Sequence, residues 1–262
     1  TPMSQSSLNI LYEDPSLIVC AKPHGIATQS RNIGARDMES MLKTYIYQHC
    51  SPKNKNYSQT REPYLAVIHR LDQPVSGILV FSKTPQSARA LNLQLQKKQF
   101  RKYYRALTDG IPAKNQGVLE DYLVKDGRTN TSRICSPDSP GAKYARLEYY
   151  TVAVGASPIP GDNSGHSVKE ECFFKNPSSD QAELEIHLDT GRHHQIRVQL
   201  ASMGCPIAGD TKYHSLSSKA APPSRETDAI LQLCAFHLEF FHPLSGAPMS
   251  FHLTEDVGAR QI

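Results

Sequence analysis

The sequence lacks a long hydrophobic run, a secretory signal and any closely spaced pair of cysteines. No stretch among its 262 residues approaches the ~20 consecutive apolar residues of a membrane helix. The N-terminal segment TPMSQSSLNI has neither the basic start nor the apolar run of a secretory signal. We therefore expect a cytoplasmic protein that has no membrane partner.

The cysteines lead to the same expectation. All six lie far apart in the sequence, and most of them sit inside apolar runs. We interpret them as reduced thiols in the core of an intracellular protein. Six cysteines could pair in a secreted protein, but a chain of this length with 39% hydrophobic residues can bury a core without such bonds.

The charge is mildly basic, with 29 Lys and Arg against 25 Asp and Glu and a net charge of +4. This balance alone is weak evidence for a polyanionic partner. Basic residues cluster at 97–105 and at 192–197. Either cluster by itself is typical of a solvated face, but both flank candidate site residues, which favours contact with phosphates.

Short apolar runs separated by turn residues predict more strands than helices. We expect helices from Asp37 to about His49, from Thr84 to about Lys98 and from His194 to Met203, on the evidence of residues typical of helix ends. The runs that predict strands are 8–12, 17–20, 66–68, 77–81, 103–107, 119–124, 146–154, 182–188 and 231–241. Strands and helices do not alternate strictly, so we expect an α+β fold with a mixed, mostly antiparallel sheet flanked by helices and loops.

Residues 155–180, between two of these strands, are rich in Pro, Gly, Ser and Asn. We predict that they form an irregular insertion on the surface. The chain shows no internal repeat, and its length suits one large domain or two small ones.

The first candidate site is the segment HRLD at residues 69–72. It lies between two short apolar strands, and Pro74 favours a loop, where reactive side chains are common. Taken alone, the pattern fits a structural role better, with Asp72 capping a turn and Arg70 as a surface charge. A kinase catalytic loop does not fit, because Leu71 separates Arg70 from Asp72 and no glycine-rich phosphate loop precedes it.

The second candidate site is the segment TGRHHQIR at residues 190–197, at a predicted strand-to-helix junction. Its hydrogen-bond donors are concentrated on the first turn of the predicted helix, and such a helix start attracts anions. The alternative is a basic helix cap in which Arg197 is merely exposed. A metal site competes with both, because His187, His193 and His194 are close in sequence. Adjacent histidines point in different directions, and no Cys or carboxylate completes a metal-binding spacing, so we expect no metal.

The third candidate is the segment KYYRA at residues 102–106. Its two tyrosines alternate along a predicted strand, so we expect one to be buried and the other exposed. Both could simply pack in the core, and the functional alternative is that one of them stacks on a base.

Taken in order, these segments resemble the ribosomal large-subunit pseudouridine synthase A type family. The matching blocks are LYEDPSLIVCAKPHG, HRLDQPVSG, KYYRA, TGRHHQIRVQLASMGCPIAGDTKY and LCAFHLEFFHP, which together span about residues 10–252. The resemblance implies a single pseudouridine synthase catalytic domain over residues 1–262, with 155–180 inserted between blocks. It also implies an enzyme that isomerises uridines in rRNA or tRNA to pseudouridine without a cofactor.

The resemblance assigns the chemistry to Asp72, Tyr104 and Arg197. Asp72 matches the attacking carboxylate, and Arg197 matches a guanidinium that stabilises its charge in a water-poor pocket. Tyr104 matches a tyrosine that stacks on the base or accepts a proton. Arg70 would fill the gap left by the flipped nucleotide or contact phosphate. The candidate RNA-binding residues are Arg70, His69, Arg192, His194 and Lys102.

The sequence departs from the family pattern at Val75, where threonine is usual, and at His214, where glycine is common. Neither position carries a predicted chemical role. Many relatives have an N-terminal S4-type RNA-binding domain, but only about seven residues precede the first predicted strand, so we expect this domain to be absent. We also expect a monomer. The alternatives are a catalytically silent RNA-binding protein on the same fold and a metal-dependent hydrolase, which stoichiometric zinc would support.

Overall fold

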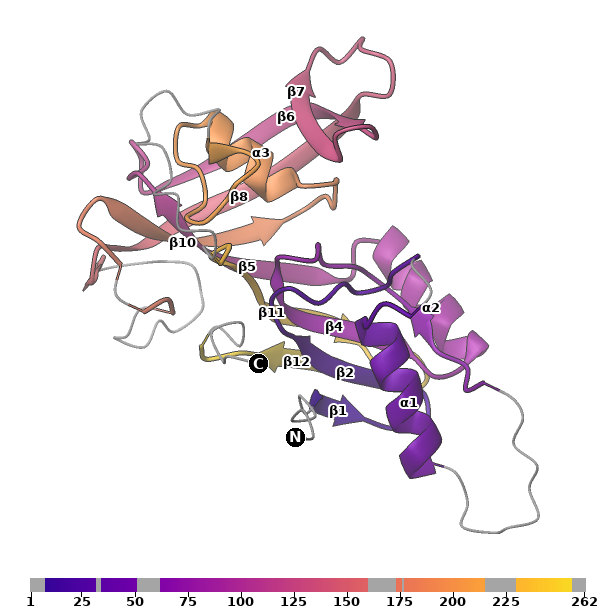
Figure 1. Ribbon diagram of the computed structural model, residues 1–262. Helices are drawn as coiled ribbons and strands as arrows, with labels where there is room; N and C mark the ends of the chain where they lie inside the picture. Colours follow the sequence, from indigo (N-terminus) through magenta and orange to yellow (C-terminus); the bar gives the residue numbers. More distant parts are fainter. Residues whose placement is uncertain are drawn as a thin grey trace, which may run out of the picture. The chain divides into compact units, whose positions relative to one another are not determined.

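The computed structural model describes residues 8–31, 34–50, 62–159, 173–175, 177–214 and 230–255. Its elements group into two compact units (Figure 1). The first unit contains residues 1–100, 237–253 and 257–262, and the second contains residues 101–236 and 254–256. Within the described residues, none of the helices has the length and apolar character that a membrane crossing requires.

The sheet of the first unit is built on two completely buried strands. β2 (Leu17–Lys22) and β4 (Ser76–Ser82) pair antiparallel along their whole length, from Leu17 opposite Ser82 to Lys22 opposite Gly77. Both strands read as short continuous apolar runs, LIVCA and GILVF, which is typical of strands with both faces covered.

The other strands of this unit surround that pair. β1 (Asn9–Glu13) pairs with β2, and β3 (Ala66–Val67) pairs with β4. β11 (Leu233–Phe241) begins in the second unit and ends in the first, where it neighbours β4 and pairs with β12 (Pro248–His252).

Both helices of the first unit begin next to a residue whose side chain caps them. α1 (Met38–Cys50) follows Asp37, which accepts a backbone N–H three residues further on at 2.8 Å. α2 (Pro85–Gln96) follows Thr84, which does the same at 3.2 Å, with a proline in the first turn. The predicted caps at Asp37 and Thr84 are therefore confirmed.

The second unit contains an antiparallel sheet with the strand order β5-β10-β8-β6-β7. Its strands are β5 (Arg101–Asp109), β6 (Gln116–Asp126), β7 (Thr131–Cys135), β8 (Lys143–Val154), β9 (Ser157–Pro158) and β10 (Gln181–Leu188). β6 alternates between more and less exposed residues, whereas successive residues of β10 are buried, so β10 is covered on both faces.

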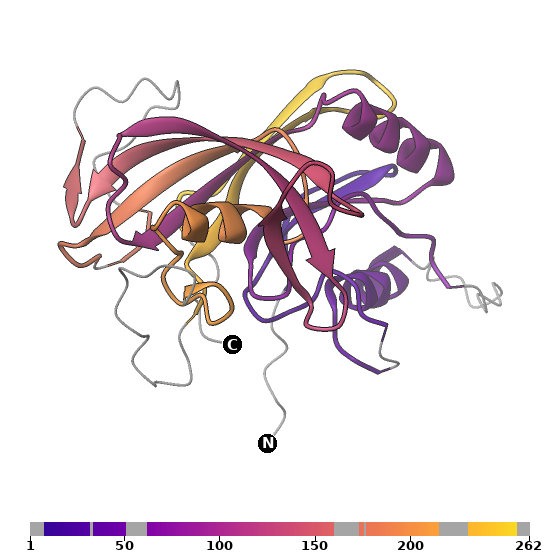
Figure 2. The ribbon, with the colours of Figure 1, turned by 90° about the horizontal axis from the view of Figure 1, so that it is seen from above.

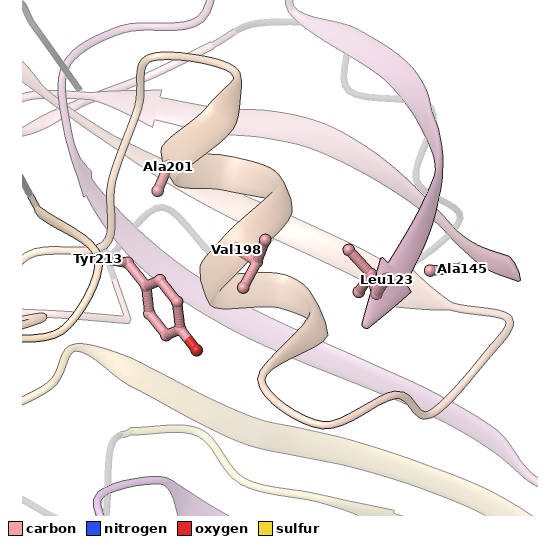
Figure 3. Packing of buried hydrophobic residues seen from close by; sticks show 5 residues of the cluster. All are labelled: Leu123, Ala145, Val198, Ala201 and Tyr213. Carbon is pink, nitrogen blue, oxygen red and sulfur yellow. The ribbon is translucent and has the colours of Figure 1, made fainter. Parts of the chain in front are cut away.

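A short helix, α3 (Gln195–Ser202), lies against the strands of the second unit (Figure 2). Seven of its eight residues are buried. Val198 and Ala201 of the helix pack with Leu123 of β6, Ala145 of β8 and the ring of Tyr213 (Figure 3). Because the helix is enclosed, its polar side chains must find partners inside the unit.

The expected α+β class with a mostly antiparallel sheet is confirmed, and all three predicted helices are present. The sequence patterns do not predict β7, β9 or β12. These strands have five, two and five residues, and their mixed polarity carries no clear period.

The predicted surface insertion at residues 155–180 is wrong near its C-terminal end. Phe174 is 2% exposed and belongs to a cluster of buried apolar side chains. The backbone N–H groups of Phe174 and the residue before it donate to the Glu183 carboxylate, at 3.4 Å and 2.9 Å. Two adjacent phenylalanines therefore outweigh the polar composition around them. Residues 160–172 and 176 lie outside the described residues.

Four described cysteines are free, and three of them, Cys20, Cys205 and Cys234, are buried. Burial raises the pKa of Cys20 to about 12, so its thiol stays protonated and unreactive. The interpretation of the cysteines as core thiols is confirmed for these three, whereas Cys135 is partly exposed.

The carboxylate of Asp14 organises the turn between β1 and β2. Its Oδ1 accepts the N–H groups of Ser16 and Leu17, at 2.7 Å and 2.9 Å, and its Oδ2 pairs with Nε2 of His242 at 2.7 Å. Burial alone would raise the pKa of Asp14, but hydrogen bonds from His242 and Ser16 hold this pKa well below its usual range. The ionised carboxylate thus joins this turn to the residue that follows β11 within the first unit.

We predict that Asp14→Asn lowers the free energy of unfolding by about 1–3 kcal/mol near neutral pH, because the turn loses a charged acceptor. A carboxylate with a lowered folded-state pKa stabilises the protein above the unfolded value of ~3.9, and this contribution is lost as the pH falls toward the folded value. Urea unfolding at neutral pH and at a pH of about 3 should therefore show a smaller difference from wild type in acid. The exposed Asp138→Asn is the control, and equal losses in both variants would contradict the assignment.

Candidate active site

The loop that carries Asp72 joins β3 to β4 in the first unit. Its turn is closed by a hydrogen bond from the N–H of Val75 to the carbonyl of Asp72 at 3.0 Å, and Pro74 restricts the backbone inside the turn. Leu71 and Val75 are buried, whereas Asp72 between them is half-buried. The apolar neighbours anchor the loop and leave the Asp72 side chain partly accessible.

A buried lysine fixes the backbone of this loop. Lys22, the last residue of β2, has no exposed surface. Its ammonium group donates to the carbonyls of Pro23, Ile26 and Gln73, at 3.0 Å, 2.6 Å and 3.0 Å. A buried ammonium group is costly unless it is hydrogen-bonded, so these three carbonyls and Lys22 hold one another in place. The residue after Asp72 is thereby tied to the end of β2.

Two further pairs of residues strengthen the same attachment. The N–H of Gly25 donates to the carbonyl of Gln73 at 3.1 Å, and the Gln73 amide group donates to the carbonyl of Gly25 at 2.9 Å. The Thr28 hydroxyl donates to the carbonyl of Leu71 at 2.9 Å and accepts its N–H at 3.1 Å. The residues on both sides of Asp72 are therefore held by the segment 22–28.

The two predicted RNA-binding residues of this loop are placed differently. Arg70 is exposed, and its guanidinium donates to the side-chain oxygen of Gln29 at 2.6 Å. The half-buried His69 accepts the N–H of Val80 on Nε2 at 3.3 Å, and its ring packs edge-on against Phe100. Arg70 is therefore exposed to solvent, whereas the His69 ring is held at the start of the loop.

Tyr103 and Tyr104 of β5 are both buried, each with 7% of its surface exposed. The prediction that one of them is exposed is wrong. They still face opposite sides of the sheet, and Tyr103 packs edge-on against His187 of β10 at 4.7 Å between ring centroids. The sheet is covered on both faces at this point, which alternation of residue types alone does not reveal.

Arg105, the last residue of the basic run at 97–105, is structural. It is 7% exposed and forms ion pairs with Glu183 at 3.4 Å and Glu185 at 2.9 Å, and its guanidinium lies 4.9 Å from the centre of the Phe236 ring. The prediction that this run faces RNA is therefore wrong at Arg105, because its charge is buried and neutralised. Glu183 and Glu185, two residues apart in β10, are the sequence signal that could identify the partners of Arg105.

The loop before α3 is organised by the buried side chain of Gln195. Its Oε1 accepts the Thr190 hydroxyl at 2.8 Å and the N–H of Arg192 at 3.0 Å. Its amide group donates to the carbonyl of Arg146 at 3.1 Å and to the side-chain oxygen of Gln199 at 3.0 Å. Each hydrogen-bonding group of this side chain has a partner, which fixes the course of the loop.

Arg197 is held rigidly by Asp210 in the interior of the second unit. The two residues are 4% and 2% exposed, and both contacts of their bidentate ion pair, Nε to Oδ2 and Nη2 to Oδ1, measure 2.7 Å. Such a pair fixes the plane of the guanidinium. The alternative that Arg197 is an exposed basic cap is therefore wrong. Asp210 is the site residue that sequence analysis missed, although it stands in the matching block at GDTKY.

His194 is a buried, neutral imidazole. The Tyr213 hydroxyl accepts the N–H of Ser132 at 2.8 Å and forms a hydrogen bond of 2.6 Å with His194 Nδ1. Burial, followed by the positive charge of Arg197, lowers the pKa of His194 to about 3. A direct contact of His194 with phosphate is not favoured, because the side chain is enclosed and uncharged. Its observed ring contacts are the hydrogen bond with Tyr213 and a stacked contact with His193.

Lys102 and Arg192 are both neighbours of Gly191 in the second unit, Lys102 in space and Arg192 as the next residue in the chain. Arg192 is exposed, and its Nε donates to the carbonyl of Tyr144 at 2.8 Å. The Lys102 ammonium group packs over Gly191, since a Cβ at that position would lie 3.5 Å from Nζ. Burial lowers the pKa of Lys102. The basic residues of the second and third sequence candidates thus meet at one loop.

The predicted residues are divided between the two units. Asp72, His69 and Arg70 belong to the first unit, and the predicted residues of the second unit are Tyr104, Arg197, Lys102, Arg192 and His194. Across the part of the chain that the structure describes, no group of three or more His, Cys, Asp or Glu side chains is arranged to hold a metal ion.

Residues 16–202 match the family model described as RNA pseudouridylate synthase. A protein named "Uncharacterized RNA pseudouridine synthase YhcT", from Bacillus subtilis, is 32% identical over 79% of this chain and 57% of its own length. A "Ribosomal large subunit pseudouridine synthase D" from Neisseria meningitidis is 28% identical over 94% of this chain and 57% of its own length. A "tRNA pseudouridine synthase C" from Pasteurella multocida is 29% identical over 91% of this chain and 88% of its own length.

The fold is also similar to that of a solved structure, "Human RNA Pseudouridylate Synthase Domain Containing 4". The two chains are 21% identical with a TM-score of 0.65, and the match covers 94% of this chain and 87% of that one. This likeness concerns the fold alone. The chain spans only 57% of the length of each of the first two relatives.

We predict that Lys22→Met lowers the free energy of unfolding by about 2–4 kcal/mol, because the change leaves buried carbonyls without their donor. Lys83→Met is the matched control. Its ammonium group pairs with Glu13 at a partly exposed position, so its loss should cost less than ~1 kcal/mol. Urea unfolding of both variants measures the difference, and equal losses would rule out the proposed role of Lys22.

Proposed function

The chain belongs to the RNA pseudouridylate synthase family, and from this premise we propose that it isomerises uridine to pseudouridine in RNA. The observation that carries the proposal is the loop around Asp72. Its carboxylate is partly accessible, while the backbone on both sides is fixed by buried hydrogen bonds from Lys22 and Thr28. A reactive group held in this way loses little entropy when it meets its substrate.

In the proposed reaction, Asp72 is the nucleophile that attacks the flipped-out uridine or its ribose, and the bond that its carboxylate forms is broken again before the product leaves. The C1′–N1 bond breaks, the base rotates, and a C1′–C5 bond forms. A proton leaves C5 and another is gained at N1, so the reaction is an isomerisation with no net redox change. It therefore requires no cofactor and no second substrate.

Tyr104 and Arg197 are the other proposed catalytic residues. The buried position of Tyr104 suits a ring that stacks on the base in a water-poor site, and its hydroxyl suits proton transfer. Arg197 supplies N–H donors of fixed direction, because the bidentate pair with Asp210 prevents its guanidinium from turning. Donors that are already oriented stabilise a developing anion without reorganisation during the reaction.

Arg70, Arg192 and Lys102 are the proposed RNA-binding residues among the original candidates. The exposed guanidinium groups of Arg70 and Arg192 retain donors for phosphate oxygens or bases. For His69 and His194 we propose positioning roles in place of direct RNA contact. The substrate class stays rRNA or tRNA, and cytoplasmic location and a monomeric state stay predictions.

The alternative function is an RNA-binding protein that uses the same surface without catalysis. Asp72, Tyr104 and Arg197 are all present, which favours the enzyme. Tight binding of RNA by the purified protein, with no pseudouridine formed on any cellular RNA, would favour the alternative.

We predict that Asp72→Asn reduces pseudouridine formation on unmodified rRNA and tRNA transcripts by more than about a thousandfold, because the amide is not a competent nucleophile. Asp138→Asn changes the same chemical group at an exposed position outside the loop and should retain wild-type activity. Mass spectrometry of nucleosides, with circular dichroism to verify folding, provides the readout. Full activity in a folded Asp72→Asn variant would exclude the mechanism.

The adjacent tyrosines provide a matched pair for testing Tyr104. Tyr104→Phe keeps the ring and removes the hydroxyl, and we predict a fall in turnover of about 10²–10⁴-fold if the hydroxyl transfers a proton. Tyr103→Phe makes the same change at an equally buried position on the opposite face of the strand. Single-turnover rates of the two variants separate catalysis from packing, and similar rates would refute a chemical role for the hydroxyl.

A further inference from the structure

Exposed apolar side chains gather in the first unit, beside the turn between β11 and β12. Leu93 of α2, Phe241 of β11 and Leu244 of the turn are 48%, 42% and 55% exposed. The helix and the hairpin of β11 and β12 lie side by side (Figure 2), and the Gln94 side chain joins them. A single exposed leucine is common on protein surfaces, but three large apolar side chains on adjoining elements are typical of an interaction site.

Hydrogen bonds fix the backbone that presents these side chains. The Gln94 amide group donates to the carbonyl of Phe241 at 2.8 Å, and its side-chain oxygen accepts the N–H of Phe241 at 2.9 Å. The N–H of His242 donates to the carbonyl of Ala247 at 2.8 Å, which closes the turn, and His242 Nδ1 accepts the N–H of Ser245 at 3.1 Å. A surface built in this way loses little backbone entropy when it binds a partner.

The charges around these apolar side chains are positive. Residues 84–101 contain four cations and no Asp or Glu, and residues 240–250 contain no Asp, Glu, Lys or Arg. Three of the four cations, Arg89, Lys97 and Lys98, are exposed. Among the residues that the structure describes, none of these three forms a salt bridge. Their charge is therefore available to an anionic partner.

Two carboxylates border this surface, and each of them already faces a histidine ring. Oδ2 of Asp14 lies 2.7 Å from Nε2 of His242, and Oε1 of Glu239 lies 3.6 Å from Nε2 of His237. The surface itself thus combines apolar side chains with positive charge. Such a combination complements a partner that carries apolar side chains and negative charge.

The surface lies at the end of β4 that is remote from Asp72. The Asp72 loop leads into Ser76, the first residue of β4, whereas Ser82, its last residue, lies opposite Leu17. The Asp14 side chain joins the turn before Leu17 to the turn after β11. A strand of seven residues spans about 20 Å, so RNA bound at the Asp72 loop need not reach this surface.

We propose that this surface, the α2 patch, docks a protein segment whose apolar side chains are flanked by Asp or Glu. The patch consists of Arg89, Leu93, Lys97, Lys98, Phe241 and Leu244. Arg89 and Lys97 stand four residues on either side of Leu93, so acidic side chains can pair with them while apolar ones pack between. RNA fits less well, because a leucine offers a phosphate backbone neither charge nor a stacking surface. The inference is independent of the proposed function.

The test uses the full chain and two labelled synthetic peptides. Both are amphipathic helices of about 18 residues with leucine on one face, and the polar face carries glutamate in one peptide and lysine in the other. Fluorescence anisotropy should show that the glutamate peptide binds at least about tenfold more tightly than the lysine peptide, with an affinity that falls as salt rises. Equal binding of the two peptides, or binding of neither, would overturn the inference.

An apolar substitution places the peptide on the patch. Leu244→Ser should weaken binding of the glutamate peptide about tenfold, because it removes an exposed anchor from an ordered turn. Ile111→Ser is the matched control, at an apolar residue of the second unit that is 47% exposed, and it should leave the affinity at the wild-type value. Circular dichroism verifies that both variants fold. Equal affinities of the two variants would reject the patch as the docking site.

The charged contribution has its own pair of variants. Lys97→Gln combined with Lys98→Gln should weaken binding of the glutamate peptide severalfold and make its affinity less dependent on salt. Lys114→Gln combined with Lys143→Gln removes the same charge at exposed positions of the second unit and should change neither quantity. An unaltered salt dependence in the first variant would exclude these lysines from the docking site.

Other anionic partners and the proposed function are tested with the same proteins. If a polyadenylate strand or vesicles that contain phosphatidylserine bind wild type but not Leu244→Ser, while the glutamate peptide does not bind, the patch serves RNA or a membrane and the inference is wrong. Pseudouridine formation by Leu244→Ser should equal that of wild type, and its loss in the folded variant would also contradict a separate docking site. Wild-type protein that binds the peptide but forms no pseudouridine would reject the proposed function alone.

Discussion

The hydrogen bonds from the buried ammonium group of Lys22 are the constraint on which the loop of Asp72 depends. A lysine with no exposed surface is tolerated only if its hydrogen-bond donors are satisfied. Here the carbonyls come from two segments that are far apart in the sequence, the residues after β2 and the loop at Gln73. Neither segment can move without leaving a buried charge unpaired. The loop is consequently fixed by groups that are not themselves reactive, and Asp72 keeps its carboxylate partly accessible while its backbone is immobile.

The second unit uses buried polar side chains in the same way. Gln195 fixes the loop before α3, Asp210 fixes the guanidinium of Arg197, and Tyr213 bonds to both Ser132 and His194. These residues lie in the interior beside Val198 and Ala201, where water does not compete for their hydrogen bonds. Packing and polar contacts therefore support each other. Apolar residues of α3 pack against the strands, and the enclosed polar groups orient Arg197 and the loop before the helix.

Local signals in the sequence predict the helices and the long strands well. The caps at Asp37 and Thr84 are properties of a few adjacent residues, so they can be read without knowing the tertiary structure. The burial of both Tyr103 and Tyr104 depends on what covers each face of β5, and the pairing of Arg105 depends on a strand about 80 residues away. The candidate segments could be located by pattern, but Asp210, the partner that fixes Arg197, could be found only from the fold.

The fate of the basic residues illustrates why charge clusters in a sequence are ambiguous. Arg105 lies in a basic run, yet two glutamates in the neighbouring strand neutralise it, so it serves the interior. Lys125 and Arg128 belong to neither predicted cluster, but both are exposed, with Lys125 near the end of β6 and Arg128 in the turn between β6 and β7, and Asp126 is the one carboxylate among residues 123–135. What makes a cation available to a ligand is the absence of a better anion among its spatial neighbours, and those neighbours are set by strand register. A basic residue can therefore be assigned to RNA only after its cross-strand partners are known.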